Sequence, residues 1–204
     1  MSSNEQSVKK KNSHIRLIGL ITIAVTICLG ILLLVNPLRF ILSTPPVSSE
    51  MKSLVLEQDK IEFMYPENWF AHLTPQGNHG DLEVIAIATA PGIGFQNMIV
   101  ARKQFNNDDL SVVADWSLSR IKSRFVTYEV DIPIPYSSEH FSGLISEYTA
   151  TTGSPLETQN AHCKDLFFLH EQNGYAFSFC ADESDWIELS PIFDEIMASI
   201  RSLE

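Results

Sequence analysis

The longest uninterrupted apolar stretch of the chain lies near its start, at residues 17–38. Its twenty-two positions contain no charged side chain, and as a helix they would extend roughly 33 Å, enough to cross a hydrocarbon core about 30 Å thick. A cleaved signal peptide is the alternative, but its apolar core is usually only about 7–15 residues long. Residues 36–41 also offer no small-x-small cleavage site. The pattern therefore predicts one uncleaved transmembrane anchor.

Beyond residue 54 the pattern changes to short apolar and β-branched runs separated by turns rich in glycine and proline, as is typical of β-strands. In the last of these runs Tyr175, Phe177 and Phe179 share one face, which we expect to lie against the core. We expect strands at residues 61–65, 82–89, 97–105, 127–134, 141–151, 164–170 and 175–181.

Two segments follow the three- and four-residue spacing of an amphipathic helix. We expect Asn107 or Asp108 to cap the first helix, and Ser190 to cap the second with Pro191 at its first helical position. Trp116 lies off the apolar stripe of the first helix, so it either packs under a loop or is exposed at a contact surface, and we favour packing. The two stripes are Leu110, Val113, Ala114, Leu118, Ile121 and Phe125, and Ile192, Phe193, Ile196, Met197, Ile200 and Leu203.

These elements predict an α+β fold, in which an antiparallel β-sheet is flanked by helices as an α-β-α sandwich, preceded by one N-terminal transmembrane helix. The expected organisation is a basic tail at residues 1–16, the anchor at 17–38, a linker rich in serine and proline at 39–53, and one domain at 54–204. A domain of this length can bury its own core.

Charge is distributed unevenly along the chain. Four basic residues precede the apolar stretch and Arg39 alone follows it directly, so the positive-inside rule places the amino terminus in the cytoplasm and the domain outside. We therefore expect a single-pass protein of the cell membrane that contacts lipid through residues 17–38. Residues 40–204 contain nine basic and twenty-four acidic residues, a net charge of −15. This charge disfavours nucleic acid and favours a positive or polar protein partner, unless it only keeps the domain soluble.

Cys163 and Cys180 flank a turn signal. If the turn is centred on Gln172-Asn173, Phe168 lies opposite Phe177 and the two cysteines share a face but are offset by two positions. A register shift of two would place them directly opposite. A disulfide and two buried thiols therefore both remain open, and an oxidising compartment outside the membrane permits the bond.

Residues that carry chemistry are sparse. Asn78, His79 and Asp81 lie in the one polar loop whose composition could bind a cation or a small ligand, although a plain turn between strands is the alternative. The histidines lack the spacing of a zinc site, and no Gly-x-Ser-x-Gly motif is present. The acidic run at residues 182–188 lacks the alternating pattern of a calcium loop, so we expect a solvated connection. We predict no catalytic, cofactor-binding or metal-binding residues.

Two segments together resemble a known family. They are Ile61-Glu62-Phe63-Met64-Tyr65-Pro66-Glu67-Asn68-Trp69, and the run from Gly174-Tyr175-Ala176-Phe177-Ser178-Phe179 to Ser199-Ile200. This combination resembles the PsbP-like superfamily, which also includes periplasmic DcrB-type proteins and a Ran-binding import factor family. The resemblance covers most of residues 54–204. It implies an α-β-α sandwich, and it implies binding or assembly on membrane complexes without shared catalytic residues.

The sequence thus favours a membrane-tethered, extracytoplasmic binding or assembly module that contacts another membrane or envelope protein. A solute-sensing or solute-binding domain is the alternative, followed by an extracytoplasmic hydrolase. A shallow surface would favour the module, whereas a deep pocket containing a carboxylate or histidine of perturbed pKa would favour the enzyme.

Overall fold

The computed structural model describes residues 46–74, 83–91, 96–106, 108–122, 125–154 and 157–203. The chain divides into a unit at residues 1–44 and a compact unit at 45–204, and all described residues belong to the second. The expected anchor and the candidate loop residues Asn78, His79 and Asp81 lie outside the described residues. Among the described residues, no helix combines the length and apolar character needed to cross a bilayer.

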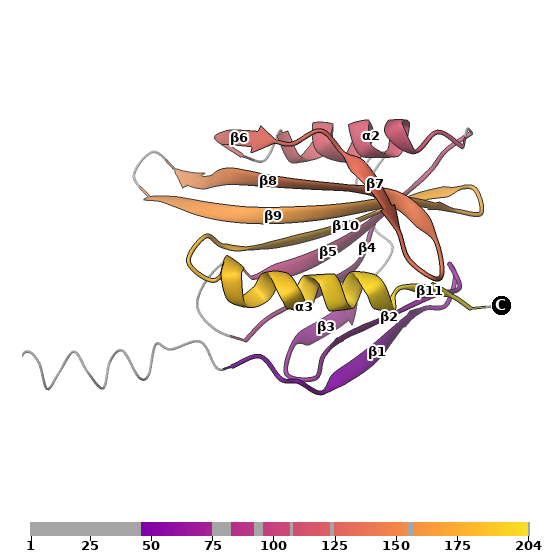
Figure 1. Ribbon diagram of the computed structural model, residues 1–204, viewed down its shortest axis with the longest axis horizontal. Helices are drawn as coiled ribbons and strands as arrows, with labels where there is room; N and C mark the ends of the chain where they lie inside the picture. The colour runs from indigo at the N-terminus through magenta and orange to yellow at the C-terminus, as the bar shows by residue number, and fades with distance from the viewer. Residues whose placement is uncertain are drawn as a thin grey trace, which may run out of the picture. The chain divides into compact units, whose positions relative to one another are not determined.

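The described unit is built on an antiparallel sheet of eight strands in the order β3-β4-β5-β10-β9-β8-β6, with β7 also paired to β8 (Figure 1). A smaller sheet has the order β1-β2-β11. The strands of the main sheet are β3 (Phe70–Leu73), β4 (Glu83–Thr89), β5 (Asn97–Gln104), β6 (Thr127–Val130), β7 (Ile134–Ser137), β8 (Ser142–Ser154), β9 (Glu157–His170) and β10 (Asn173–Asp182). The remaining elements are β1 (Met51–Leu56), β2 (Ile61–Pro66), β11 (Arg201–Ser202), α2 (Leu110–Lys122) and α3 (Trp186–Ser199).

The two helices cover opposite faces of the main sheet. Neighbouring residues of β10 show this, because successive residues of a strand point to opposite sides. Phe177 of β10 belongs to the large core cluster that includes Phe193 of α3, and its ring meets that of Phe63 of β2 edge to face at 5.3 Å. The neighbouring Ala176 packs in a separate cluster with Val113 of α2. The predicted antiparallel sheet with two helices is confirmed, and so is the burial of the aromatic face of β10.

Each face of the main sheet is covered only in part. Helix α2 packs mainly against β8, β9 and β10, whereas α3 contacts β10 and the small sheet. The α2 side over β3, β4 and β5 is therefore left without a helix, and so is the α3 side near β6 and β8. These two uncovered areas lie on opposite faces and at opposite ends of the strand order.

The β9–β10 hairpin adopts the register that the sequence left open as an alternative, shifted by two positions from the one centred on Gln172-Asn173. The turn consists of Glu171–Gln172 rather than Gln172–Asn173, and Phe168 pairs with Tyr175 rather than with Phe177. Glu171 has a φ of 55°, the positive value that a tight two-residue turn requires at one or both of its central positions. Because the turn lies one residue earlier in the chain, every pair along the hairpin shifts by two positions.

This register places Cys163 directly opposite Cys180. Their sulfur atoms form a disulfide, with the two Cα atoms 4.2 Å apart. Both cysteines are buried on the α2 side, in a cluster with Tyr148, Ala150 and Ala161. The bond joins two central strands, and closing a loop of this length is worth about 3 kcal/mol in the chain-entropy model.

Helix α3 begins earlier than predicted. Asp185 occupies its N-cap and Trp186 is its first residue, so Ser190 is not the cap and Pro191 lies inside the helix. The hydrogen bond that Pro191 cannot donate would have gone to the carbonyl of Ile187, a residue that is 88% exposed. The earlier start is favoured because it buries the indole of Trp186.

The cap of α2 also differs from the prediction. The helix begins at Leu110, and the carboxylate of Asp109 accepts a hydrogen bond of 2.9 Å from the backbone N–H of Ser111. Asp109 therefore takes the capping role predicted for Asn107 or Asp108, because its side chain reaches a free N–H of the first turn.

The edges of the sheets differ most from the sequence-based prediction. The expected strand at residues 127–134 divides into β6 and β7 around Pro133, which cannot donate to a strand ladder. Strand β9 starts at Glu157, and the sequence did not predict β1, β3 or β11. Strand β1 begins at Met51, within the segment that the sequence assigned to the linker.

Candidate binding surfaces

A polar hollow of about 460 Å³ occupies the uncovered area near β6 and β8. Glu147 of β8 pairs in register with Lys164 of β9, and Lys164 reaches Asp194 of α3, so this side of the strands is the α3 side. We call this hollow the acidic groove. It is lined by Thr127, Tyr128 and Glu129 of β6, Thr149, Ala150 and Thr151 of β8, Asn160 of β9, and Glu183 after β10.

The floor of the acidic groove is a row of hydroxyl and amide groups. The Thr127 hydroxyl donates to the Thr151 hydroxyl at 3.0 Å, and that of Thr151 donates to Oδ1 of Asn160 at 3.3 Å. The three residues occupy matching positions on three adjacent strands. Strand register therefore fixes a polar floor on which a ligand can form hydrogen bonds.

His162 lies next to the groove, as the cross-strand partner of Thr149. Its ring stacks on the indole of Trp186, with centroids 4.1 Å apart and planes inclined by 5°. Its Nε2 lies 2.8 Å from a carboxylate oxygen of Glu147, and its Nδ1 lies 3.5 Å from one of Glu183. The imidazole is thus held between two carboxylates and cannot turn without losing the stack.

Lys164 lies two residues after His162, on the same face of β9, and is only 8% exposed. Its ammonium lies 2.8 Å from Asp194 and 3.9 Å from Glu147, donates to the Ser190 hydroxyl at 3.3 Å, and lies 5.7 Å from the Trp186 ring. Carboxylates therefore already neutralise this lysine.

The charge that remains around the groove is negative. Glu129 and Glu183 line the groove, and Glu147 and Asp194 lie on the same side of the sheet, whereas Lys164 contributes one positive charge. Such a site attracts a lysine or arginine side chain and repels anions. Among the described residues, no group of three or more histidine, cysteine, aspartate or glutamate side chains is arranged to hold a metal ion.

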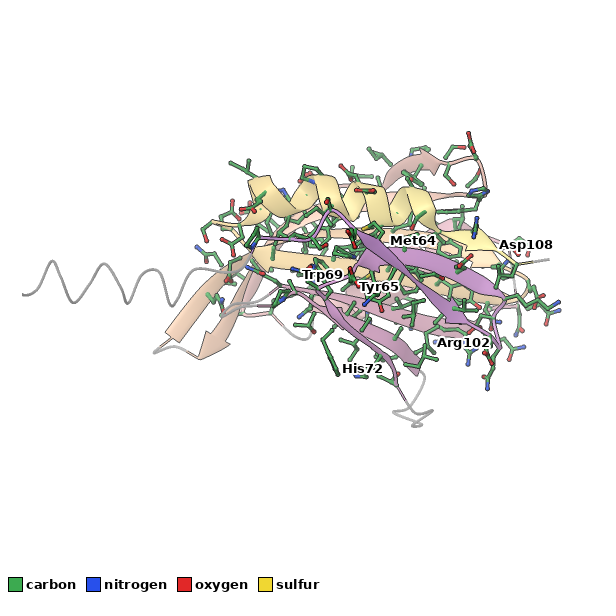
Figure 2. The ribbon with its side chains drawn as sticks, turned by 90° about the horizontal axis from the view of Figure 1, so that it is seen from below. Met64, Tyr65, Trp69, His72, Arg102 and Asp108 are labelled. Carbon is green, nitrogen blue, oxygen red and sulfur yellow. A yellow bond between two sulfur atoms is a disulfide. The ribbon has the colours of Figure 1, made fainter. Side chains whose placement is uncertain are left out.

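A second hollow, of about 190 Å³, lies between the β1–β2 turn and strands β3 and β4. Leu56, Leu73 and Ile85 form its apolar walls, and we call it the Leu56 pocket. At its base the carboxylate of Asp59 accepts hydrogen bonds from Arg102, labelled in Figure 2, and from the hydroxyl of Tyr175. Burial raises the pKa of Tyr175 and the bond to Asp59 raises it further, so this tyrosine stays a donor.

Asp165 is fully buried on the opposite side of the sheet, beneath α2. The Tyr148 hydroxyl lies 3.2 Å from its Oδ1, and Ser178 is its cross-strand partner. Burial raises the pKa of Asp165 to about 7, although the charge of Arg120 acts in the opposite direction. Asp165 lines neither the acidic groove nor the Leu56 pocket, so its shifted pKa reflects its packing in the core.

The residues singled out in the sequence do not converge on one site. Cys163 faces the α2 side and its neighbour His162 the α3 side, as expected for adjacent residues of a strand. The acidic run is divided among three separate interactions. Asp182 accepts a hydrogen bond from Gln159, Glu183 contacts His162, and Asp185, at the N-cap position of α3, accepts a hydrogen bond from Gln96.

Sequence reasoning missed the acidic groove because its parts come from distant segments. His162 and Lys164 alternate along β9, which is a visible signal for a shared face. Their partner Glu147 lies on another strand, and only the β8–β9 register places it opposite Lys164.

The fold is similar to those of two solved structures. One is cyanobacterial PsbP (CyanoP) from Synechocystis sp. PCC 6803, with a TM-score of 0.56 and 14% identity over 76% of this chain and 93% of that one. The other is the Ran-binding protein Mog1p of Saccharomyces cerevisiae, with a TM-score of 0.52 and 9% identity over 77% of this chain and 97% of that one. No protein-family model and no curated protein matches the sequence. The described unit therefore has the PsbP-like fold that its motifs predicted.

Proposed function

We propose that this chain is a membrane-tethered, extracytoplasmic binding or assembly module, and that its acidic groove receives a positively charged segment of another membrane or envelope protein. The observation that carries the proposal is that two exposed carboxylates, Glu129 and Glu183, line a hydroxyl-lined hollow that has Glu147 and Asp194 on the same side of the sheet. Mog1p, which shares the fold, is a Ran-binding protein, so protein binding is compatible with this architecture.

The structure of the groove suits recognition of a peptide. Glu129, Thr149 and Asn160 are exposed, so an incoming lysine or arginine can approach from solvent. The carboxylates would steer the encounter, and the threonine and asparagine groups would satisfy the donors of a polar backbone. Strand β6 also ends the described part of the main sheet, so an extended segment could lie along it.

The tether makes modest affinity sufficient. An anchor at residues 17–38 would confine the domain to the surface on which a membrane partner is displayed, and confinement raises the effective concentration of each for the other. A groove whose ion pairs are largely exposed contributes little affinity by itself, so this arrangement suits a binding module that stays close to its partner.

Charge reversal within the groove tests the proposal. The double variant Glu129→Lys/Glu183→Lys, in the full-length protein in its native membranes, is expected to lose most of the cross-linked partner that the unmodified chain captures, because a cationic segment would then meet like charges. The matched control is Glu188→Lys/Glu195→Lys, which changes the net charge equally at exposed positions of α3 outside the groove lining. Equal loss in both variants, or no loss in either, would contradict the role of the groove.

A solute-binding domain is the second candidate, and the Leu56 pocket is the observation that favours it. Its apolar walls and its paired Arg102 and Asp59 suit a small apolar molecule with one polar end. Thermal stabilisation of the unmodified protein by such a molecule, lost in Leu73→Glu, would support this function, and charge reversal in the acidic groove would leave that stabilisation unchanged.

A further inference from the structure

The second uncovered area of the main sheet differs from the acidic groove in chemistry. It lies on the α2 side, over the three strands at the other end of the sheet. We call it the β3–β5 face. By strand alternation and register its members are Phe70 and His72 of β3, Val84, Ile87 and Thr89 of β4, and Asn97, Ile99, Ala101 and Lys103 of β5.

Phe70 is the most prominent side chain of this face. It is 73% exposed, although it is one of the largest apolar residues of the domain. Its ring lies 5.5 Å from that of His72, which Figure 2 shows at the edge of the sheet. Val84, Ile87 and Ile99 are half-buried behind it. The face therefore presents an apolar surface that no described element covers.

The β3–β5 face also lacks negative charge. Among its described members there is no aspartate or glutamate, whereas residues 40–204 as a whole carry a net charge of −15. Its one full charge is positive. Lys103 lies over the ring of Phe105 at 5.9 Å, and Phe105 contacts Trp116 of α2 edge to face at 5.7 Å. These contacts confirm that Trp116 packs, and they set the limit of the face toward α2.

The chain enters the domain at the β2–β3 turn, next to the strand that carries Phe70. The Asn68 side chain donates to the carbonyl of Pro46 and accepts from the N–H of Ser48, each at 3.0 Å. Val47 packs against the large core cluster, which lies on the α3 side of the sheet. Asn68 lies only two residues before Phe70. Residues 46–48 are therefore hydrogen-bonded to the turn that precedes Phe70. At about 3.5 Å per residue, a fully extended chain from residue 38 to residue 46 spans at most roughly 28 Å.

We propose that the β3–β5 face, with Phe70 as its most prominent side chain, contacts the surface of the lipid bilayer that holds the anchor. This inference depends on the tether in the proposed function. The short linker keeps lipid within reach of Phe70, an aromatic ring is well suited to the boundary between headgroups and acyl chains, and the missing carboxylates remove the repulsion that the rest of the domain would experience from anionic headgroups. The acidic groove lies on the other face of the sheet and stays free for a partner.

Photocross-linking in vesicles tests this contact directly. Full-length protein carrying Phe70→p-benzoylphenylalanine is inserted into phosphatidylcholine vesicles containing phosphatidylglycerol, and irradiated. The matched control is Ile187→p-benzoylphenylalanine, because Ile187 is 88% exposed on α3 and is thus more accessible than Phe70. Burying one aromatic side chain favours the docked state by roughly tenfold, so lipid adducts at position 70 are expected to exceed those at position 187 by about that factor.

Alkaline extraction of the same vesicles separates the two ways in which the experiment can fail. Protein that is not inserted speaks against the tether, and therefore against the proposed function. In inserted protein, equal lipid adducts at both positions would overturn the docking inference alone. Adducts at position 70 to a second copy, or to another protein in native membranes, would also overturn it, because they would show that the β3–β5 face binds protein.

Discussion

Asp165 shows how a single buried side chain couples stability to pH. Its carboxyl lies between β8 and β10 with the Tyr148 hydroxyl and Ser178 as neighbours, and burial raises its pKa from the ordinary 3.8 to about 7. A folded-state pKa above the unfolded one means that the native protein retains its proton over a wider range. The stability from the neutral carboxyl is therefore fully present below about pH 4 and is lost as pH rises toward about 7.

The variant Asp165→Asn tests this coupling, because an amide cannot ionise but can still accept from Tyr148. At about 1.36 kcal/mol per pKa unit, a shift from 3.8 to about 7 corresponds to at most about 4 kcal/mol. The free energy of unfolding in urea of the unmodified protein is expected to fall relative to that of the variant between about pH 4 and about pH 7, and to run parallel above that range. The control is Asp115→Asn, at an exposed position of α2. Parallel curves throughout would contradict the burial argument.

At the scale of elements, the β8–β9 pair depends on a glycine. A Cβ added at Gly143 would overlap the backbone carbonyl oxygen of Phe167 and approach the Phe168 side chain at 3.4 Å. Both neighbours belong to the central strand β9 and cannot move independently of the sheet. The close approach of the two strands at this position therefore requires a residue without a side chain.

Gly143→Ala is accordingly expected to lower the free energy of unfolding by about 2 kcal/mol or more, since the overlap is with backbone. The neighbouring substitution Ser142→Ala, at an exposed position of the same strand, is expected to change it by less than about 0.5 kcal/mol. Urea unfolding of the three proteins measures both effects. A Gly143→Ala variant as stable as the unmodified protein would show that the strands can separate there at no cost.

The boundaries of the helices and strands were harder to predict from the sequence than their existence. The apolar stripe of the second predicted helix is confirmed. However, local rules place Pro191 at the first helical position, whereas α3 begins five residues earlier, at Trp186, whose indole packs in the core. The hairpin register depended on whether Glu171 accepts a positive φ, which its residue type does not favour. In α3, a tertiary contact outweighed a local preference.

At the scale of the whole domain, the incomplete cover of the main sheet creates two surfaces of different chemistry. The acidic groove lies on the α3 side at the β6 end, and the β3–β5 face lies on the α2 side at the β3 end. A module placed between a bilayer and a partner needs two such surfaces on opposite sides. One attracts by charge, and the other by the removal of apolar area from water.

The two surfaces are expected to respond differently to salt. Raising the ionic strength from about 0.1 M to about 1 M shortens the Debye length from about 10 Å to about 3 Å. Partner capture through the acidic groove is expected to fall several-fold, while lipid adducts at position 70 are expected to remain or to increase. Cross-linking of the same membrane preparation at both salt concentrations measures the two together. A parallel decrease would show that charge, rather than apolar contact, holds the β3–β5 face.

The sequence by itself determined the class of the fold. Alternating aromatics in residues 175–179 and two helical stripes predicted an antiparallel sheet with two helices, because periodicity depends only on which face of each element is buried. The Tyr-Pro-x-x-Trp segment contributed the resemblance to the PsbP-like superfamily, which implies the same architecture. The anchor, the orientation and the candidate loop at Asn78, His79 and Asp81 stay predictions, since they lie outside the described residues.

Only the tertiary structure decided which chemistry comes together. The pairing of Cys163 with Cys180, the contact of Glu147 with Lys164 and His162, and the exposure of Phe70 all depend on strand register and on how much of the sheet each helix covers. These are properties of packing between segments distant in the chain, and a one-residue change in register moves every side chain to the other face. Local pattern narrowed the β9–β10 register to two alternatives but did not decide between them.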